Sequence, residues 1–400
     1  MESRIPHPDA PLTPDPHGYP GHSPFRDAAS EPIPVSAAAE HPARSRQVSG
    51  DPVSQTPLIH DLLPQDWNLP GQKTFRRKQI AEWIFKQKVD SFDKMLNLPE
   101  SLRTELSTRY SLNPLTLIRQ QGSRDTTRKF LFRTRDQDFI ECVLIPASPS
   151  LYGDRSDRFT LCISSQVGCA FACKFCASGL DGWKRNLTPG EIISQIIAVE
   201  KCSGDAVRNL VFMGMGEPFA NYKNLTTALT SINAPWGLNI GARHITVSTS
   251  GLVPVIRQYA DQPSQFRLAI SLHGASDEVR SRIMPVNKRY PLHELLEACR
   301  YFNSRKKQKI TFEYILIRGI NDTPEQARLL VKHASTLNAK INLIPYNTVD
   351  GLDWQRPDDD TIRSFQQILE SGGIFSTVRL EKGHDIDAAC GQLRLKEIKV

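Results

Sequence analysis

The sequence predicts an α/β protein built mainly from a partial (β/α)6 barrel, and three observations support this prediction. From about residue 158 onward, short apolar runs alternate with longer amphipathic segments, which is typical of a parallel sheet with crossover helices. Before the barrel, residues 58–120 carry apolar side chains at helical spacing, which indicates a small helical accessory domain. The first 57 residues are rich in proline and poor in aromatic residues, so we expect a disordered extension there.

The composition fits a globular protein of two or three domains. The chain has 400 residues, of which 39% are hydrophobic and 23% charged. It contains no run of about 18 apolar residues and no apolar stretch like that of a signal peptide, so we expect a cytoplasmic protein without a membrane partner. We also expect a monomer. A net charge of +7 is compatible with a nucleic-acid substrate but does not by itself indicate one.

The extension, residues 1–57, has Tyr19 and Phe25 as its only aromatic residues. Such a segment cannot bury enough apolar surface to offset the entropy of the chain. It is either an extension without a fixed role or a tail that binds a partner.

The accessory domain is predicted to contain one longer helix followed by two short ones. Phe75, Ile80 and Trp83 lie at helical spacing, and two short helices should begin near Ser91 and Pro99. Basic residues surround the first helix: Arg76, Arg77, Lys78, Lys86 and Lys88. They form either a solvated face or a surface that grips RNA phosphates without reading sequence.

Residues 121–157 are predicted to form a β-hairpin and a linker. Alternating apolar residues at 128–133 and 139–145 flank a turn at 136–138. Glu141 lies on the second strand, on the same face as Val143, where an exposed strand carboxylate would be ordinary.

The barrel itself is assigned to residues 158–400. Strands are expected at 159–164, 209–213, 244–249, 266–272, 310–317 and 340–345, with helices at 188–202, 221–233, 253–260, 291–305, 324–337 and 359–371. Thr188 and Pro189 fit the N-cap and first position of the first of these helices. In barrels of this type, the chemistry takes place at the C-terminal ends of the strands.

Three cysteines follow the first barrel strand in a Cys-x3-Cys-x2-Cys arrangement: Cys169, Cys173 and Cys176. No fourth cysteine or histidine lies within the next twenty residues, whereas structural zinc normally has four protein ligands. Three thiolates also suit a four-iron cluster with one open iron. Eight cysteines in the whole chain, three of them clustered, favour metal binding or catalysis over a disulfide framework. The spacing leaves an iron–sulfur cluster, a zinc ion and three structural cysteines as alternatives.

Polar residues stand at the ends of the other strands. Gly216 and Glu217 follow the second strand, where glycine allows close backbone approach and a carboxylate can accept from an ammonium group. Ser248 ends the third strand and His273 follows the fourth, although a lone histidine at such a position is often structural. Because polar residues occur at the ends of several neighbouring strands, the sequence indicates a cofactor site there.

Two further cysteines lie apart from the three in the loop. Cys162 is in the first barrel strand, and Cys390 lies beyond the last strand, next to Gly391. Each could be an ordinary buried or inert thiol, but small neighbours keep a thiol accessible, as a nucleophile requires.

The Cys-x3-Cys-x2-Cys motif, with Phe175 before its last cysteine, resembles the signature of radical S-adenosylmethionine (SAM) enzymes. The strings SSQVGC at 164–169, RNLT at 185–188 and DIDAACGQL at 385–393 resemble more narrowly the RlmN/Cfr family of RNA adenine methyltransferases. The resemblance covers roughly residues 60–395. Lys382 stands where arginine is more usual, and the longer basic tail common in relatives is missing, so we expect altered carrier-loop contacts and weaker RNA binding.

The resemblance implies a radical SAM barrel in which Cys169, Cys173 and Cys176 hold a [4Fe–4S] cluster, with SAM on the open iron. It implies that the accessory domain binds RNA, and that an electron donor such as flavodoxin or ferredoxin reduces the cluster. The SAM-binding residues implied by the family are Gly216, Glu217, Ser248, Ser271, Leu272, His273 and Asn347.

It also implies a route for methylating adenine C2, an electrophilic carbon that cannot attack a SAM methyl. One SAM methylates Cys390, and a second yields a 5′-deoxyadenosyl radical that removes hydrogen from this methyl group. The carbon radical adds to the base, Glu141 accepts a proton, and Cys162 releases the product by forming a disulfide with Cys390. The implied substrates are 23S rRNA, in the peptidyl-transferase region, and the adenosine next to the anticodon of tRNA. The alternatives are C8 methylation of the Cfr type, a paralogue that binds SAM without activity, and a non-catalytic RNA-binding protein stapled by zinc.

Overall fold

The computed structural model describes residues 56–147, 158–180, 182–349, 351–379, 382–388 and 391–393. The predicted disorder of the extension and the predicted role of Cys390 therefore concern residues outside the described ranges, apart from the last two positions of the extension. None of the helices in these ranges is long and apolar enough to cross a membrane.

A ten-stranded sheet forms the centre of the fold, in the order β1-β2-β3-β4-β7-β8-β9-β10-β11-β12. The strands are β1 (Leu115–Gly122), β2 (Arg128–Thr134), β3 (Phe139–Pro146), β4 (Phe159–Cys162), β7 (Val207–Phe212), β8 (Ile245–Thr249), β9 (Arg267–Ser271), β10 (Ile310–Leu316), β11 (Ala339–Pro345) and β12 (Ser376–Val378). Neighbours from β1 to β4 are antiparallel, and neighbours from β4 to β12 are parallel. The parallel part confirms the predicted alternation of parallel strands and helices.

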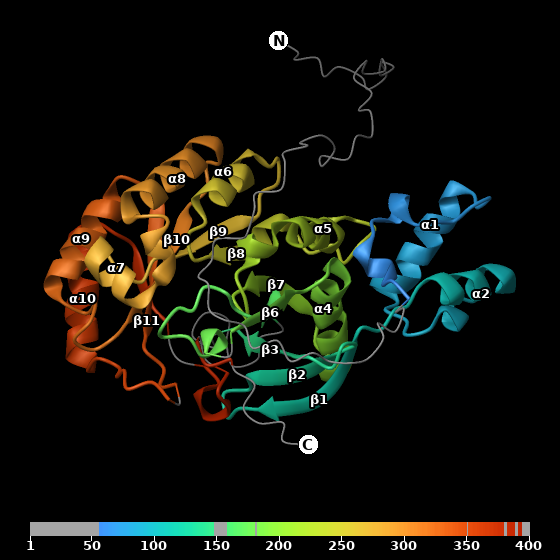
Figure 1. The fold of residues 1–400 in the computed structure, drawn as a ribbon, viewed down its shortest axis with the longest axis horizontal. Coiled ribbons are helices and arrows are strands. Elements are labelled where there is room, and N and C mark those ends of the chain that lie inside the picture. Colours follow the sequence, from blue (N-terminus) through green and yellow to red (C-terminus); the bar gives the residue numbers. More distant parts are fainter. Residues whose placement is uncertain are drawn as a thin grey trace, which may run out of the picture. The chain divides into compact units, whose positions relative to one another are not determined.

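Helices connect consecutive parallel strands, and Figure 1 shows them along the outside of the strands. They are α4 (Pro189–Ser203), α5 (Tyr222–Asn233), α6 (Val253–Asp261), α7 (Asp277–Ile283), α8 (Leu292–Arg305), α9 (Pro324–Ser335) and α10 (Asp359–Ser371). The predicted start of α4 is confirmed, because Thr188 and Glu191 form a reciprocal capping box with Pro189 in the first turn.

The N-terminal helices bury Trp67, Ile80 and Leu106 almost completely, and these side chains belong to the same continuous hydrophobic core as the barrel. The elements are η1 (Ile59–Asp61), η2 (Pro64–Asp66), α1 (Thr74–Ala81), the π-helical η3 (Glu82–Lys86), η4 (Phe92–Lys94) and α2 (Glu100–Arg109). Asp61 joins this part to the barrel, since its carboxylate accepts from the Gly190 N–H at the start of α4.

Several elements differ from the sequence-based expectation, among them the small strands β5 (Gln166–Gly168) and β6 (Trp183–Asn186). β1 occupies residues expected to be helical or linker. The sequence did not predict this strand because its side chains are exposed and show no alternating buried face. α7 and β12 were not expected either. Both are short: α7 is a polar seven-residue helix, and β12 has three residues.

Candidate active site

A pocket lies at the C-terminal ends of the parallel strands, and most of the residues singled out from the sequence line it. This main pocket contains about 930 Å³ of empty space, part of which is open solvent. Its lining includes Cys169, Cys173, Cys176, Gly216, Glu217, Ser248, Ser271 and His273. The fold thus brings together residues from one loop and three strand ends.

The three cysteines lie on a loop whose described residues are 169–180 and 182, and we call it the cysteine loop. Its base is a small two-stranded sheet of β5 (Gln166–Gly168) and β6 (Trp183–Asn186), and the Cys169 N–H donates to the Gly182 carbonyl at 3.0 Å. Gly168 has φ +71°, and a Cβ there would lie 1.9 Å from the Gly182 oxygen. Only glycine therefore allows the loop to close in this way.

The chemistry of the loop fits a metal cluster. Burial raises the pKa of the Cys169 thiol to about 12 and raises that of Cys173 well above its usual value. Such thiols become thiolates only beside a strong positive charge, which bound iron would supply. Within the described ranges, no three His, Cys, Asp or Glu side chains converge closely enough to hold a single ion. The three loop thiolates would hold a four-iron cluster, which takes cysteine thiolates as ligands.

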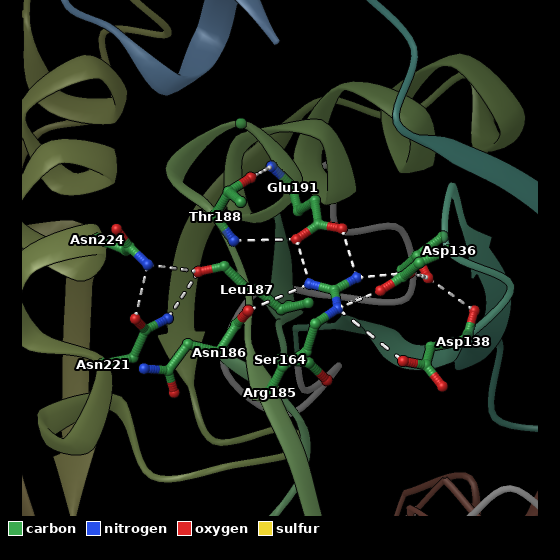
Figure 2. A network of polar contacts seen from close by, with 12 residues as sticks. Asp136, Asp138, Ser164, Arg185, Asn186, Leu187, Thr188, Glu191, Asn221 and Asn224 are labelled. Carbon is green, nitrogen blue, oxygen red and sulfur yellow. Dashed lines mark hydrogen bonds and ion pairs between the residues drawn. The ribbon is translucent and has the colours of Figure 1, made fainter. Parts of the chain in front are cut away.

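An ion-pair network fixes the base of the cysteine loop (Figure 2). Arg185, on β6, donates from Nη1 and Nη2 to the two carboxylate oxygens of Glu191 at 2.8 Å each. From Nη2 and Nε it donates to Asp136, in the turn between β2 and β3, at 2.8 and 2.5 Å. Burial lowers the pKa of Arg185, but hydrogen bonds to Glu191 and Asp136 more than offset this, so the net shift is upward. The network ties the loop both to α4 and to the β2–β3 turn.

Gly216 and Glu217 occupy a tightly packed turn after β7. Gly216 has φ +99°, and a Cβ there would lie 2.5 Å from the Gln166 side chain. The buried Glu217 carboxylate accepts from the Phe219 N–H at 3.0 Å and from the Ser250 N–H at 2.7 Å. Burial raises the pKa of Glu217. Each carboxylate oxygen has two lone pairs, so Glu217 can still accept from a ligand ammonium.

The next strand ends contribute hydroxyl groups and an imidazole. Ser248 and Ser271 lie side by side, with their Oγ atoms 3.4 Å apart. The Nδ1 atom of His273 accepts from the Ile315 N–H at 3.1 Å, which assigns the proton to Nε2. Burial lowers the pKa of His273 to about 3, so it is neutral at physiological pH. Its ring meets Phe175 edge-on at 4.7 Å.

Two of the expected SAM-site residues lie elsewhere. The Leu272 side chain is fully buried in the hydrophobic core, so only its backbone is near the pocket. Asn347 lines a second, adjoining cavity. We call this cavity the Cys162 pocket. Its lining includes Cys162, Val143 and Asn347, and it shares Cys176 and Gly391 with the main pocket.

The segment after β12 forms a wall of both cavities. The Gly391 carbonyl accepts from the Ala177 N–H at 2.8 Å, and the Leu393 carbonyl accepts from Ser178 Oγ at 2.7 Å. Farther back, the Gly383 N–H donates to Asp125 at 2.9 Å. Contacts from the β1–β2 turn and from the cysteine loop therefore hold the residues on either side of position 390.

Glu141 is buried rather than exposed. Its carboxylate pairs with Lys129 Nζ at 3.3 Å, and both side chains are less than a tenth exposed. Lys129 also donates to the Asp387 carbonyl at 3.3 Å, which joins this pair to the segment before Cys390. In the described part of the chain, Glu141 does not line either pocket. Its predicted role as a proton acceptor stays a prediction.

Two buried polar residues beside the main pocket were not anticipated. Gln166 accepts from the Glu217 N–H at 2.8 Å, and the fully buried Arg280 bonds the strand-end backbone. Gln166 lies within the SSQVGC string, which could have singled it out. Arg280 lies in a polar stretch that resembles a solvated helix.

Comparison with known proteins agrees with this geometry. Residues 163–331 match the model of the Radical SAM superfamily, and residues 68–112 match that of the Ribosomal RNA large subunit methyltransferase N-terminal domain. Membership of the superfamily implies a [4Fe–4S] cluster and SAM.

Curated relatives match most of the chain. It is 53% identical over 327 residues to "Probable dual-specificity RNA methyltransferase RlmN" of Akkermansia muciniphila, covering 82% of this chain and 91% of the relative. A protein of the same name from Geobacillus kaustophilus is 44% identical over 365 residues, covering 90% and 98% of the two chains. The crystal structure of a radical SAM methyltransferase from Sphaerobacter thermophilus superposes with a TM-score of 0.80 at 42% identity, covering 85% of this chain and 100% of the other. With this identity over nearly the whole length of its relatives, the chain belongs to the RlmN family of the radical SAM superfamily.

Proposed function

We propose that this protein is a radical SAM methyltransferase that methylates adenine C2 in the peptidyl-transferase region of 23S rRNA and in the tRNA position next to the anticodon. The names of the relatives support a dual-specificity RNA methyltransferase. The observation that carries the proposal is the junction of the two pockets. Cys162 lines the cavity that Gly391 also lines, and this cavity adjoins the cysteine loop.

In this proposal, the three loop cysteines hold the [4Fe–4S] cluster, and Glu217, Ser248, Ser271 and His273 bind SAM. Together the cluster and SAM supply the radical that activates a methyl group. The buried Glu217 carboxylate faces the SAM ammonium group, and the paired serine hydroxyls are suited to the ribose. Iron and acid-labile sulfide in anaerobically purified protein test the cluster. Stoichiometric zinc without sulfide would instead support a non-catalytic RNA-binding protein.

Cys390 carries the methyl group in this proposal, and Cys162 resolves the covalent intermediate. A thioether between Cys390 and the base has no easy leaving path until a second thiol captures the sulfur. Cys162 is suited to this step because it is in the cavity beside Gly391, whereas Cys142 on the adjacent strand is in the hydrophobic core. Glu141, held by Lys129, is proposed to take the proton from the base.

We propose that fewer basic residues of the accessory domain contact RNA than the sequence analysis expected. Arg77 donates to the Pro64 and Trp67 carbonyls at 2.7 and 2.6 Å, and Lys88 pairs with Glu200 of α4 at 2.6 Å. These side chains hold the domain together and join it to the barrel. Lys78 is exposed and Lys86 half-buried, so we propose these two as contacts to RNA phosphates.

Covalent trapping tests the two-cysteine mechanism. Cys162→Ala should accumulate a protein–RNA adduct that survives a denaturing gel, and the Cys162→Ala/Cys390→Ala double variant should form none. Cys142→Ala is the matched control and should turn over normally. Normal turnover by Cys162→Ala, or an adduct with Cys390→Ala, would show that the mechanism is wrong. Nucleoside analysis of 23S rRNA and tRNA then identifies the methylated carbon, and 8-methyladenosine would replace the C2 assignment with C8.

A further inference from the structure

Arg280 of α7 is a charged side chain with no exposed surface. Its Nε donates to the Leu272 carbonyl at 3.1 Å, its Nη2 to the Ser250 carbonyl at 2.5 Å and its Nη1 to Asn287 Oδ1 at 2.7 Å. Burial lowers the pKa of Arg280 to about 10, so the guanidinium stays protonated at neutral pH. Burying such a charge costs several kcal/mol unless its donors are satisfied.

The backbone around Arg280 is shaped to admit it. Gly251 has φ +114°, and a Cβ there would lie 3.1 Å from Nη2. A Cβ at Gly274 would lie 2.8 Å from the Arg280 backbone nitrogen. Two glycines, one after β8 and one after β9, therefore leave room for this residue.

Both carbonyls that Arg280 binds belong to strand ends beside the main pocket. The Ser250 residue whose carbonyl accepts from Nη2 also donates its N–H to Glu217 at 2.7 Å. Leu272 stands between Ser271 and His273, which both line the pocket. The guanidinium thus holds the backbone between Ser271 and His273. It also holds the Ser250 residue whose N–H binds Glu217.

We propose that Arg280 is a positioning residue for the SAM pocket. Its planar fork fixes the Ser250 and Leu272 carbonyls, and through them the directions of Glu217, Ser271 and His273. The inference rests on the proposed function in that the main pocket is taken to bind SAM. Lysine would keep the charge but lose the planar fork, so Arg280→Lys separates geometry from charge.

SAM binding to the cluster-containing protein tests this role. In equilibrium dialysis without reductant, Arg280→Lys should weaken SAM binding roughly 10–100-fold, by analogy with the loss of groups that orient metal-binding residues. Arg282→Lys is the matched control, because Arg282 lies on the same helix and is exposed. Its affinity should stay within about two-fold of the original. Iron content and thermal unfolding should be recorded for each variant, so that affinities refer to folded, loaded protein.

A spectroscopic measurement distinguishes positioning from general stability. Adding SAM should change the EPR spectrum of the reduced cluster in the original protein and in Arg282→Lys, but not in Arg280→Lys at the same SAM concentration. Should Arg280→Lys fail to fold, Asn287→Ser removes the acceptor of Nη1, together with the Nδ2 hydrogen bonds to Asp277 and Ser281, and must still weaken SAM binding. Unchanged affinity in a folded, iron-loaded Arg280→Lys or Asn287→Ser variant would overturn the role of Arg280. Absence of SAM binding by the original protein would overturn the SAM site as well.

Discussion

Replacing Arg185 with methionine should loosen the base of the cysteine loop and lower the stability of the protein by about 3 kcal/mol. Arg185 holds β6 to Glu191, whose side chain is 6% exposed, and to Asp136, whose side chain is 42% exposed. It also makes a longer ion pair with Asp138 at 3.9 Å on the same outer side as Asp136. The two arms of the network should therefore contribute very unequally.

The inner arm dominates the expected loss. Removing one partner of a buried ion pair costs about 3–5 kcal/mol, because the other charge stays buried. Here the cost is reduced to about 2–3 kcal/mol, since Arg185 is 28% exposed and Glu191 keeps the hydrogen bond from the Thr188 N–H at 2.9 Å. The outer arm to Asp136 adds at most about 1 kcal/mol, as is usual for exposed pairs.

Thermal and denaturant unfolding of Arg185→Met measure this loss, which corresponds to roughly 6 °C in Tm. Lys184→Met is a matched control on the same strand, because Lys184 is 56% exposed and pairs only with Asp138 in the network at 2.6 Å. It should cost no more than about 1 kcal/mol. Hydrogen exchange should accelerate in Arg185→Met at residues 166–186, before it accelerates in the barrel strands.

Two results would refute the reasoning about Arg185. If Lys184→Met and Arg185→Met cost the same, burial of Glu191 does not set the magnitude. If Arg185→Met loses stability without faster exchange at β5 and β6, the network does not hold the loop.

The remaining predictions concern pH and RNA. Burial lowers the pKa of His60 in the folded protein to about 4, whereas a histidine in the unfolded chain has a pKa near 6.5. Between these pH values the unfolded chain binds a proton that the folded protein does not. The free energy of unfolding therefore falls as pH drops from about 6.5 to about 4. At pH 5 the free energy of unfolding should be lower by about 2 kcal/mol. Denaturant unfolding of His60→Gln should show a smaller decrease over the same pH range. If both proteins showed the same pH dependence, the lowered pKa of His60 would be contradicted. Lys78→Gln and Lys86→Gln should each weaken RNA binding and reduce the salt slope by about one, without changing stability. Arg77→Gln should instead lower Tm, because its carbonyl partners lose their donor; unchanged slopes in both lysine variants would place the RNA contact elsewhere.

The barrel could be predicted from sequence because its strands are buried between helices and read as short apolar runs. The start of α4 could also be predicted, because Thr188, Pro189 and Glu191 define it through contacts within three residues of the chain. β1 was not accessible: an edge strand with exposed side chains has no buried face to impose alternation.

Most of the proposed cofactor site was also within reach of the sequence, because strand ends collect at one edge of a parallel sheet. Glu141 shows where such reasoning stops. Its burial depends on Lys129, whose neighbouring strand brings it within 3.3 Å, and a strand pattern alone cannot pair the two charges. Arg280 was missed for a similar reason, since its carbonyl partners lie 8 and 30 positions away in the chain.

The wall formed by residues 382–388 and 391–393 also sets an order of events during biosynthesis. This segment follows every described strand along the chain, so the ribosome releases it after them. Its contacts with Asp125 and Ala177 can form only once the β1–β2 turn and the cysteine loop are in place. A nascent chain interrupted just before residue 382 would possess all the described strands and all three loop cysteines, but both cavities would stand open to solvent on the side that Gly391 closes.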